Sequence, residues 1–529
     1  MNKNNQSVTW QSTLSAWQQS GCLEALAGTI RGLEKESLRV NQKTGRLAQT
    51  PHPEGLGSAL KHPYITTDYS EALVEFITPT FSDYRTPIQF LTELHQAAYR
   101  QMPGELLWAA SMPCILPDEE HIPIAHYGSS NIGRLKSLYR TGLAHRYGAL
   151  MQTIAGVHYN VSFPDLFWRR MQALKGSVDE PIQAFKNREY FHLIRNFQRY
   201  HWWLILVMGA SPAVCRSFLA GQQHSKLRDW GSNTAFLPFG TSLRMSELGY
   251  QNPQQGPLYI CHDNIDGYVK TLDAAVRTPL EAYQTLSSEH PDELVQLNAN
   301  ILQIENEYYG PVRPKRTPVG HERPTSALAN RGVEYIEVRC LDVNPFEPVG
   351  ISENQMRCVD LLMAYCLLMP SPELTQAEHQ RCQAFVSQVV YEGRCTNPAA
   401  EASYRSPLLE ARKLWVDLMV LAEQLDAAVP LAQRGYVAAL ASYGAALEHP
   451  DTLLSARILN DMKKNEQSFY EFAFNHSQAH GRSFLERHWS QESQRQSEQW
   501  AEDSRRAQSE QEAGDLIGFD EYLAQYISR

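Results

Sequence analysis

Two glutamates stand one residue apart near the amino terminus, in the stretch RGLEKESLRV at residues 31–40. If this stretch is a β-strand, Glu34 and Glu36 point to the same face, because side chains alternate along a strand. Two carboxylates on one face repel each other unless a cation lies between them. The spacing therefore indicates a site for a positively charged group, such as a divalent metal ion.

Three further segments place acidic or imidazole groups inside apolar runs that predict strands. The segments are 72–79 (ALVEFITP), 156–164 (GVHYNVSFP) and 333–343 (VEYIEVRCLDV). They contribute Glu75, His158 and Glu337. Taken alone, each polar face is more often exposed to water, and a single histidine is more often a core residue than a ligand. Taken together, the segments predict several carboxylates and one imidazole around a common cavity.

The donor types favour Mg²⁺ or Mn²⁺ over zinc, because no thiolate is grouped with the carboxylates. The nine cysteines are scattered and form no C-x-x-C pair. The chain contains no Gly-Lys dipeptide, which excludes a Walker A loop, and GLGSAL at 55–60 fails the dinucleotide fingerprint at its last position. If the protein uses ATP, it would therefore bind the phosphates through metal ions that dispersed carboxylates hold.

The composition is that of a globular enzyme, with 529 residues, 43% hydrophobic and 20% charged. A net charge of -10 disfavours nucleic acid and anionic lipid as partners. The first twenty residues lack the apolar run of a secretory leader, and the apolar run at 202–214 is too short to span a bilayer. The scattered cysteines are typical of a reducing cytosol, so a cytoplasmic protein is expected, with one disulfide left open.

The elements that must position these groups change in character along the chain. Residues 1–355 mix strands with helices; a further strand is predicted at 256–264 and a helix at 134–155, where apolar residues recur at helical spacing. Strands that come as a group, without regular alternation with helices, predict an α+β fold.

The remaining residues, 356–529, read as an α-helical region packed on a core formed by 1–355. Leu, Ala, Gln and Glu dominate here, and 406–429 is an amphipathic helix. From about residue 486 the chain is charged and rich in Gln and Ser, which indicates either a solvated helix or a partly disordered tail.

Five motifs, in order between about residues 20 and 350, resemble the bacterial type 1 glutamate–cysteine ligase family. They are RGLEKESLRV, YITTDYSEALVEFITP, YGSSNIGRLKSLYRTGL with RYGALMQTIAGVHYNVS, GTSLRMSELGY, and VEYIEVRCLDVNPF. The resemblance implies a core like that of glutamine synthetase, in which a curved, mainly antiparallel sheet forms a funnel with helices around it.

The resemblance also implies an activity, the first step of glutathione synthesis. With Mg²⁺, or Mn²⁺ in its place, the γ-carboxylate of glutamate would attack the γ-phosphate of ATP to give γ-glutamyl phosphate and ADP. The amine of cysteine would then displace phosphate to form γ-glutamylcysteine. The enzyme is expected to act as a monomer on these small molecules.

Carried over residue by residue, the resemblance assigns roles to named positions. The expected metal ligands are Glu34, Glu36, Glu75, His158 and Glu337, with Asp68 as a further candidate. The expected substrate-binding residues are Tyr69, Tyr139, Arg140, Gln152, Tyr250 and Tyr309, for which core packing is the alternative. Arg244 would bind glutamate, because a guanidinium pairs with a carboxylate at two points. Arg339 would meet the phosphoryl group, or else form a structural salt bridge with Glu337.

Three other functions stay open at this stage. A related carboxylate–amine ligase with another amine acceptor would share the metal and ATP machinery. A non-catalytic metal- or nucleotide-binding regulator would have lost ligands, but all five expected ligands are present. A helical scaffold would require residues 370–529 to fold and bind a partner alone.

Overall fold

The computed structural model describes residues 9–113, 115–220, 224–249, 258–320, 322–396 and 405–528. Its main sheet has seven strands in the order β2-β3-β1-β5-β10-β9, with β4 paired to β1, and every pairing is antiparallel. These strands are β1 (Ile30–Asn41), β2 (Ile65–Thr67), β3 (Leu73–Ile77), β4 (Glu105–Leu107), β5 (Val157–Ser162), β9 (Val312–Lys315) and β10 (Tyr335–Leu341). A smaller sheet has the order β6-β8-β7 and consists of β6 (Ala213–Cys215), β7 (Arg228–Trp230) and β8 (Thr234–Phe236).

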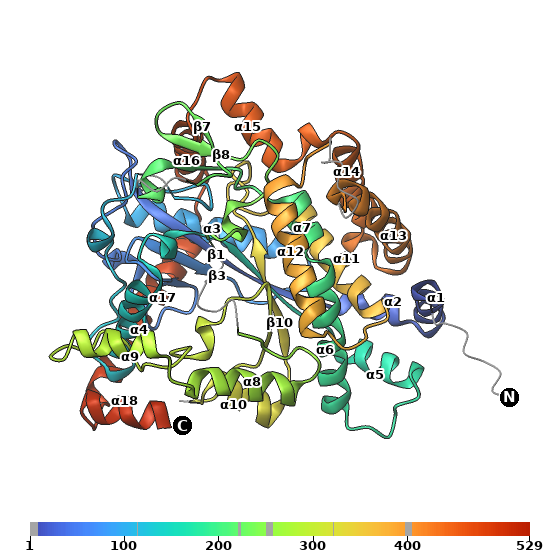
Figure 1. The fold of residues 1–529 in the computed structure, drawn as a ribbon, viewed down its shortest axis with the longest axis horizontal. Coiled ribbons are helices and arrows are strands. Elements are labelled where there is room, and N and C mark those ends of the chain that lie inside the picture. Colours follow the sequence, from blue (N-terminus) through green and yellow to red (C-terminus); the bar gives the residue numbers. More distant parts are fainter. Residues whose placement is uncertain are drawn as a thin grey trace.

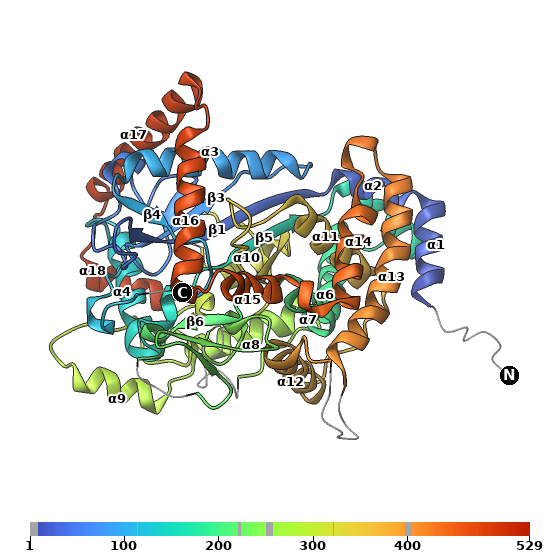
Figure 2. The same cartoon turned by 90° about the horizontal axis from the view of Figure 1, so that it is seen from above.

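Helices surround the main sheet (Figure 1). They are α1 (Trp10–Ser20), α2 (Cys22–Ala25), α3 (Arg85–Gln101), α4 (Asn131–Tyr147), α5 (Asp165–Leu174), α6 (Ile182–Tyr200), α7 (Trp202–Met208), α8 (Ile265–Arg277), α9 (Glu281–Glu289), α10 (Pro324–Arg331), α11 (Glu353–Leu368), α12 (Gln376–Glu392), α13 (Pro407–Ala428), α14 (Tyr436–Glu448), α15 (Leu454–Lys464), α16 (Phe469–Glu486), α17 (Gln491–Ala513) and α18 (Phe519–Ser528). In both views α11, α13 and α14 gather at the end of the molecule opposite α4 and α18 (Figures 1 and 2).

The two faces of the main sheet differ in what covers them. On one face, Phe76 of β3 packs on His95 of α3 with 4.4 Å between ring centroids, and Tyr159 of β5 donates to Asp360 of α11 at 2.8 Å. Leu33 of β1 is fully buried on this face. The opposite face carries the polar residues of the same strands, so the alternation predicted from the sequence separates a core face from a functional face.

The predicted strands at 31–40, 72–79, 156–164 and 333–343 are confirmed as β1, β3, β5 and β10. The expected α+β architecture, with an open antiparallel sheet and a helical C-terminal region, is confirmed as well.

The strand predicted at 256–264 is wrong for the described part of it, residues 258–264, which contains no strand. This segment forms hydrogen bonds with helix α8 and not with a neighbouring strand in the described part of the chain. The Asn264 side chain accepts a hydrogen bond from Gly267 N at 2.8 Å, and Cys261 N donates to the Thr271 hydroxyl at 3.0 Å. The apolar run is therefore an extended approach to a capped helix.

The helix predicted at 134–155 is observed as α4. It begins earlier than predicted, at residue 131, and also ends earlier, at residue 147. Gly148 has a φ of 82° and breaks the helix, and a 3₁₀ turn follows at Met151–Thr153. The predicted helix at 406–429 is confirmed as α13, and the charged tail forms the helices α17 and α18.

One apolar cluster extends from Trp10 to Phe484, so the two regions divided at residue 355 share a core; the division itself stays a prediction. Cys215 is disulfide-bonded, whereas Cys358 and Cys366 are buried free thiols. Among the described residues, no helix combines the length and the hydropathy needed to cross a bilayer.

Candidate active site

The pairing of the central strands brings together two acidic segments and one that carries a histidine. Glu36 of β1 lies opposite Glu75 of β3, and Glu34 of β1 lies opposite His158 of β5. Residues directly opposite each other on paired strands share a face, with Cβ atoms about 5 Å apart. One ligand atom each from Glu34, Glu75 and His158 lies within 4.8 Å of the others. The predicted convergence of these groups is therefore present in the fold.

Glu34, Glu36, Glu75 and His158 form a cluster that we call the acidic basin. Glu337 extends this basin to the next strand. It lies on β10 opposite Asn160 of β5, which donates to the Glu34 carboxylate at 2.8 Å. The Glu337 carboxylate is 3.2 Å from the Arg339 guanidinium and 3.5 Å from the Lys315 ammonium. The basin thus has carboxylates on β1, β3 and β10, an imidazole on β5, and a cationic edge formed by Lys315 of β9 and Arg339 of β10.

A cavity of about 320 Å³ opens over this face of the sheet. The predicted site residues that line it are Glu34, Glu36, Asp68, Tyr69, Glu75, Tyr139, Arg140, Gln152, His158, Tyr309, Glu337 and Arg339. The cavity therefore contains both the proposed ligands and the proposed substrate contacts.

Arg244 is not among the residues that line the cavity. Its side chain is fully buried, its Nη2 donates to the Arg339 carbonyl at 2.9 Å, and a side chain at Gly156 would collide with its guanidinium. Arg244 thus lies behind the cavity wall, and its role in binding glutamate stays a prediction. Tyr250 lies outside the described residues.

The electrostatics of the basin are uneven. Burial, together with the charges of the neighbouring carboxylates, raises the pKa of Glu75 well above its usual range, and burial raises the pKa of Glu36. At the cationic edge, burial opposes ionisation, yet the charges of Lys315 and Arg339 hold the pKa of Glu337 well below its usual range. The centre of the basin therefore favours an additional cation, because burial and like charge both oppose its ionised carboxylates.

The donor atoms suit a hard divalent ion. His158 Nε2 is buried and has no hydrogen-bond partner among the described residues, and it lies 3.7 Å from a Glu36 carboxylate oxygen. One Glu337 carboxylate oxygen is likewise buried without a hydrogen bond there. Carboxylate oxygens with one imidazole are ligands that Mg²⁺ and Mn²⁺ accept, so the residues fit the expected metal.

Four polar residues of the site were missed by the sequence reasoning. Asn160 stands on the same strand face as the histidine, so alternation could have found it. Lys136 precedes Arg140 by one helical turn and lines the cavity, where burial and Arg140 lower the pKa of this lysine to about 8. Arg313 and Lys315 also line the cavity, but they lie on a four-residue strand that contains a proline and gives no sequence signal.

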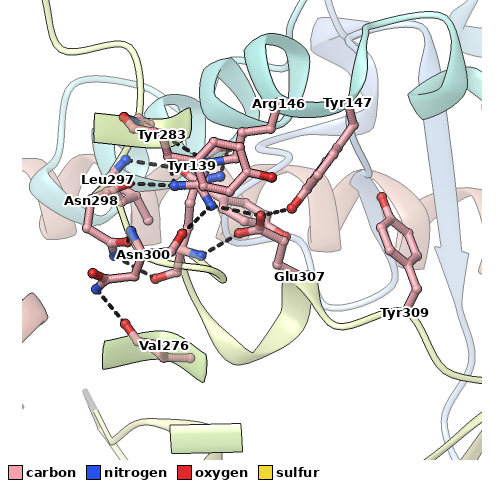
Figure 3. Close-up of polar contacts among 12 residues, drawn as sticks. Tyr139, Arg146, Tyr147, Val276, Tyr283, Leu297, Asn298, Asn300, Glu307 and Tyr309 are labelled. Atoms are coloured by element: carbon pink, nitrogen blue, oxygen red, sulfur yellow. Dashed lines mark hydrogen bonds and ion pairs between the residues drawn. The ribbon is translucent and has the colours of Figure 1, made fainter. Parts of the chain in front are cut away.

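Tyr139, Tyr147 and Tyr309 form what we call the tyrosine corner (Figure 3). Tyr139 and Tyr309 line the cavity. Gln152 donates to the Tyr309 hydroxyl at 3.2 Å, and the Tyr309 ring meets the Tyr147 ring edge-on at 6.3 Å. The pKa of Tyr139 is raised well above the usual range by burial and then by the nearby Glu307. Such a corner offers apolar walls with a few hydrogen-bonding groups, as a small amino acid requires.

A buried ion pair fixes this corner. Arg146 of α4 is 3.0 Å from Glu307, both side chains are fully buried, and Glu307 also accepts from the Tyr147 hydroxyl (Figure 3). Arg146 donates further to the Gln296 side chain at 2.9 Å and to the Asn300 carbonyl at 3.1 Å. The pair therefore joins the end of α4 to the loop that carries the tyrosine corner.

Replacing Arg146 by alanine should lower the free energy of unfolding by about 3–5 kcal/mol, because it leaves the Glu307 carboxylate buried without its cation. Urea unfolding measures the change. Arg412→Ala, which removes a partly exposed arginine paired with Glu448, serves as the control and should change the free energy by less than about 1 kcal/mol. Equal effects of the two substitutions would contradict the structural importance of the buried pair.

Comparison with known proteins places this geometry in context. Residues 14–389 match the family model described as glutamate-cysteine ligase. A glutamate–cysteine ligase of Alcanivorax borkumensis is 48% identical over 509 residues, which cover 95% of this chain and 96% of the relative. The protein of the same name from Pseudomonas putida is 44% identical over 506 residues, 95% of each chain.

The fold agrees with a solved structure of similar length. The crystal structure of the glutamate–cysteine ligase from Francisella tularensis in complex with AMP matches with a TM-score of 0.87 at 32% identity, over 95% of this chain and 98% of that one. The similarity therefore extends well beyond the five motifs and includes most of the helical C-terminal region.

Proposed function

This chain belongs to the glutamate–cysteine ligase family, and we propose that its acidic basin holds the Mg²⁺ ions that bind ATP beside glutamate. The enzyme ligates L-glutamate to L-cysteine with ATP as co-substrate, in the first step of glutathione synthesis. The observation that carries the metal proposal is the meeting of ligand atoms from Glu34, Glu75 and His158 within 4.8 Å. Mn²⁺ would serve in place of Mg²⁺, because it accepts the same donors.

The full ligand set that we propose is Glu34, Glu36, Glu75, His158 and Glu337, with Asp68 as a further member. Bound there, Mg²⁺ would neutralise charge on the phosphates during transfer. Arg339 lies at the cavity edge, where Glu337 holds its guanidinium at 3.2 Å. We propose that it contacts the phosphoryl group as this group moves from ATP to glutamate.

The substrate amino acids would be held by the walls of the cavity. We propose that Arg244 binds the glutamate carboxylate, because its guanidinium can pair with a carboxylate at two points. The proposed cysteine contacts are Tyr69, Tyr139, Gln152 and Tyr309, together with Tyr250. Arg140 is fixed at the wall, because its side chain donates to the Asp68 carbonyl and, at 2.9 Å, to the Lys136 carbonyl. It is available to contact a substrate or a phosphate.

Release of ADP in the presence of glutamate and a panel of amines tests this function. We expect release to depend on Mg²⁺ and to be much faster with cysteine than with alanine or ammonia, because the tyrosine corner accommodates a small thiol side chain. Removal of the metal with EDTA should stop the reaction, and Mg²⁺ or Mn²⁺ should restore it. Equal rates with cysteine and ammonia would overturn the acceptor assignment, and metal-independent release would overturn the role of the basin.

We also propose that the enzyme works in the cytoplasm as a monomer, without nucleic-acid or membrane partners. The net charge of -10 supports the proposal that nucleic acid and membranes are not partners. Sedimentation at micromolar concentration, with and without substrates, tests the monomer, and a dimer mass would contradict it.

A further inference from the structure

We propose that the C-terminal arm, residues 491–528, positions helix α4, the wall of the substrate cavity that carries Tyr139 and Arg140. The inference rests on the function proposed above. The arm begins just beyond the point from which the sequence indicates a solvated or disordered tail, and none of the proposed site residues lies in it. In the structure α18 lies beside α4 in both views, although more than 370 residues separate them along the chain (Figures 1 and 2).

The arm first satisfies the amino terminus of α4. The backbone N–H of Asn131, the first residue of this helix, donates to the Asp515 carboxylate, and the Asn131 side chain donates to the Ile517 carbonyl at 2.9 Å. Just before the helix, Ser129 N donates to the Glu512 carboxylate at 2.8 Å. The first N–H groups of a helix have no partner within it and favour negative charge, so two acidic side chains of the arm hold this end.

The arm then packs on apolar residues of α4. Phe519 and Leu523 of α18 are each only 7% exposed and form an apolar cluster with Leu135 and Leu138 of α4. The guanidinium of Arg134 lies 4.1 Å from the centre of the Phe519 ring. Tyr139 packs against the same cluster while it also lines the cavity. Through Tyr139, the cluster therefore links α18 directly to the lining of the cavity.

Helix α17 holds a second part of the cavity wall. Ser58 N donates to the Ser504 hydroxyl at 2.9 Å, and Lys61 Nζ donates to the Gln511 side chain at 2.9 Å. Gly57, with a φ of 78°, comes so close to Ala501 that a Cβ atom there would clash with its backbone. These residues lead into β2 and so to Asp68 and Tyr69. The arm thus bridges two segments of the cavity wall, whereas the proposed metal ligands other than Asp68 lie on the strands β1, β3, β5 and β10.

This division of contacts predicts a separation of kinetic parameters. Phe519→Ala and Asp515→Asn should each raise the KM for cysteine by about tenfold, because small displacements of a positioning wall weaken substrate binding strongly. The Mg²⁺ concentration for half-maximal activity should stay within about twofold of wild type, since all the proposed ligands except Asp68 lie on the sheet. Phe519→Leu, which keeps an apolar side chain, should restore most of the affinity.

Leu516→Ser is the matched control, because this residue of the same arm is 95% exposed, and it should leave both parameters unchanged. A fall in kcat with an unchanged KM for cysteine would mean that the substitutions only reduce the folded fraction, and would overturn the proposal. Hydrogen exchange gives a second measurement: amides of 131–147 should exchange faster in Phe519→Ala, and amides of 30–41 should not. Equal acceleration in both elements would also overturn it.

Wild-type enzyme distinguishes this inference from the proposed function. If wild type releases ADP with cysteine and glutamate but the arm variants behave like Leu516→Ser, the positioning role fails and the function stands. If wild type shows no cysteine-dependent release, the function itself fails.

Discussion

Glu75→Gln should remove nearly all Mg²⁺-dependent ligation and at the same time stabilise the metal-free protein. Glutamine keeps the shape of the side chain but provides a weaker, neutral ligand at the centre of the basin. We expect kcat/KM to fall by about 10³-fold or more, because the proposed metal would supply much of the charge stabilisation during phosphoryl transfer. Steady-state ADP release measures this loss.

The stability gain follows from the sign of the pKa shift. Burial and the neighbouring carboxylates raise the pKa of Glu75 in the folded protein, so the folded state binds its proton more tightly than the unfolded state. The metal-free wild type therefore loses stability as pH rises from the unfolded pKa of about 4.3 towards the raised value. Glu75→Gln lacks this loss and should melt at a higher temperature than wild type at pH 7 without metal.

Addition of Mg²⁺ should reverse this order, because it stabilises the wild type by binding only the folded state. Glu448→Gln, which neutralises a surface carboxylate whose side chain is 64% exposed, is the control and should change neither activity nor metal response. If Glu75→Gln keeps wild-type turnover, or if Mg²⁺ raises its melting temperature as much as that of wild type, this glutamate does not belong to the ligand set.

The composition of the basin is visible in the sequence, whereas its assembly is not. Alternation along each strand is a local property, so the shared face of Glu34 and Glu36 could be predicted from residues 31–40 alone. The pairing of Glu36 with Glu75 depends on strand order and register, which loops and the whole core determine. Before the structure is seen, these segments are linked only by their shared pattern of polar groups inside apolar runs and by the resemblance to a known family.

The tail shows a different limit of sequence reasoning. Helix α17 is polar along nearly its whole length, and its composition left open a solvated helix or a partly disordered tail; the structure shows a helix. Its docking combines small residues, Ala501 and Ser504, which fit against Gly57, with a single aromatic ring, Trp500, whose centroid lies 4.7 Å from that of Tyr64. A contact of this kind leaves no periodic apolar signal, because close approach of backbone needs small side chains and not hydrophobic ones. The strand prediction for 258–264 fails for another reason. This stretch has the composition of a strand but pairs with no strand among the described residues.

Asp360→Ala should cause one of the largest stability losses in the molecule. Asp360 of α11 accepts from Arg31 of β1 at 2.5 Å and from the hydroxyls of Tyr84 at 2.6 Å and Tyr159 at 2.8 Å. The Arg31 and Asp360 side chains are only 3% and 9% exposed. Removal of the carboxylate leaves a buried guanidinium without its counter-ion, which costs about 3–5 kcal/mol in the free energy of unfolding.

This network also connects the helical region to the strands of the active site, because Arg31 lies three residues before Glu34 and Tyr159 follows His158. Tyr84→Phe removes one hydroxyl but keeps the ion pair, so it is the matched control and should cost about 1 kcal/mol. Urea unfolding followed by fluorescence gives both values. If α11 and the sheet depend on each other as these contacts indicate, Asp360→Ala should lower the midpoint of one common transition. A loss no greater than that of Tyr84→Phe, or a separate transition for the helical region, would mean that the sheet holds the basin without α11.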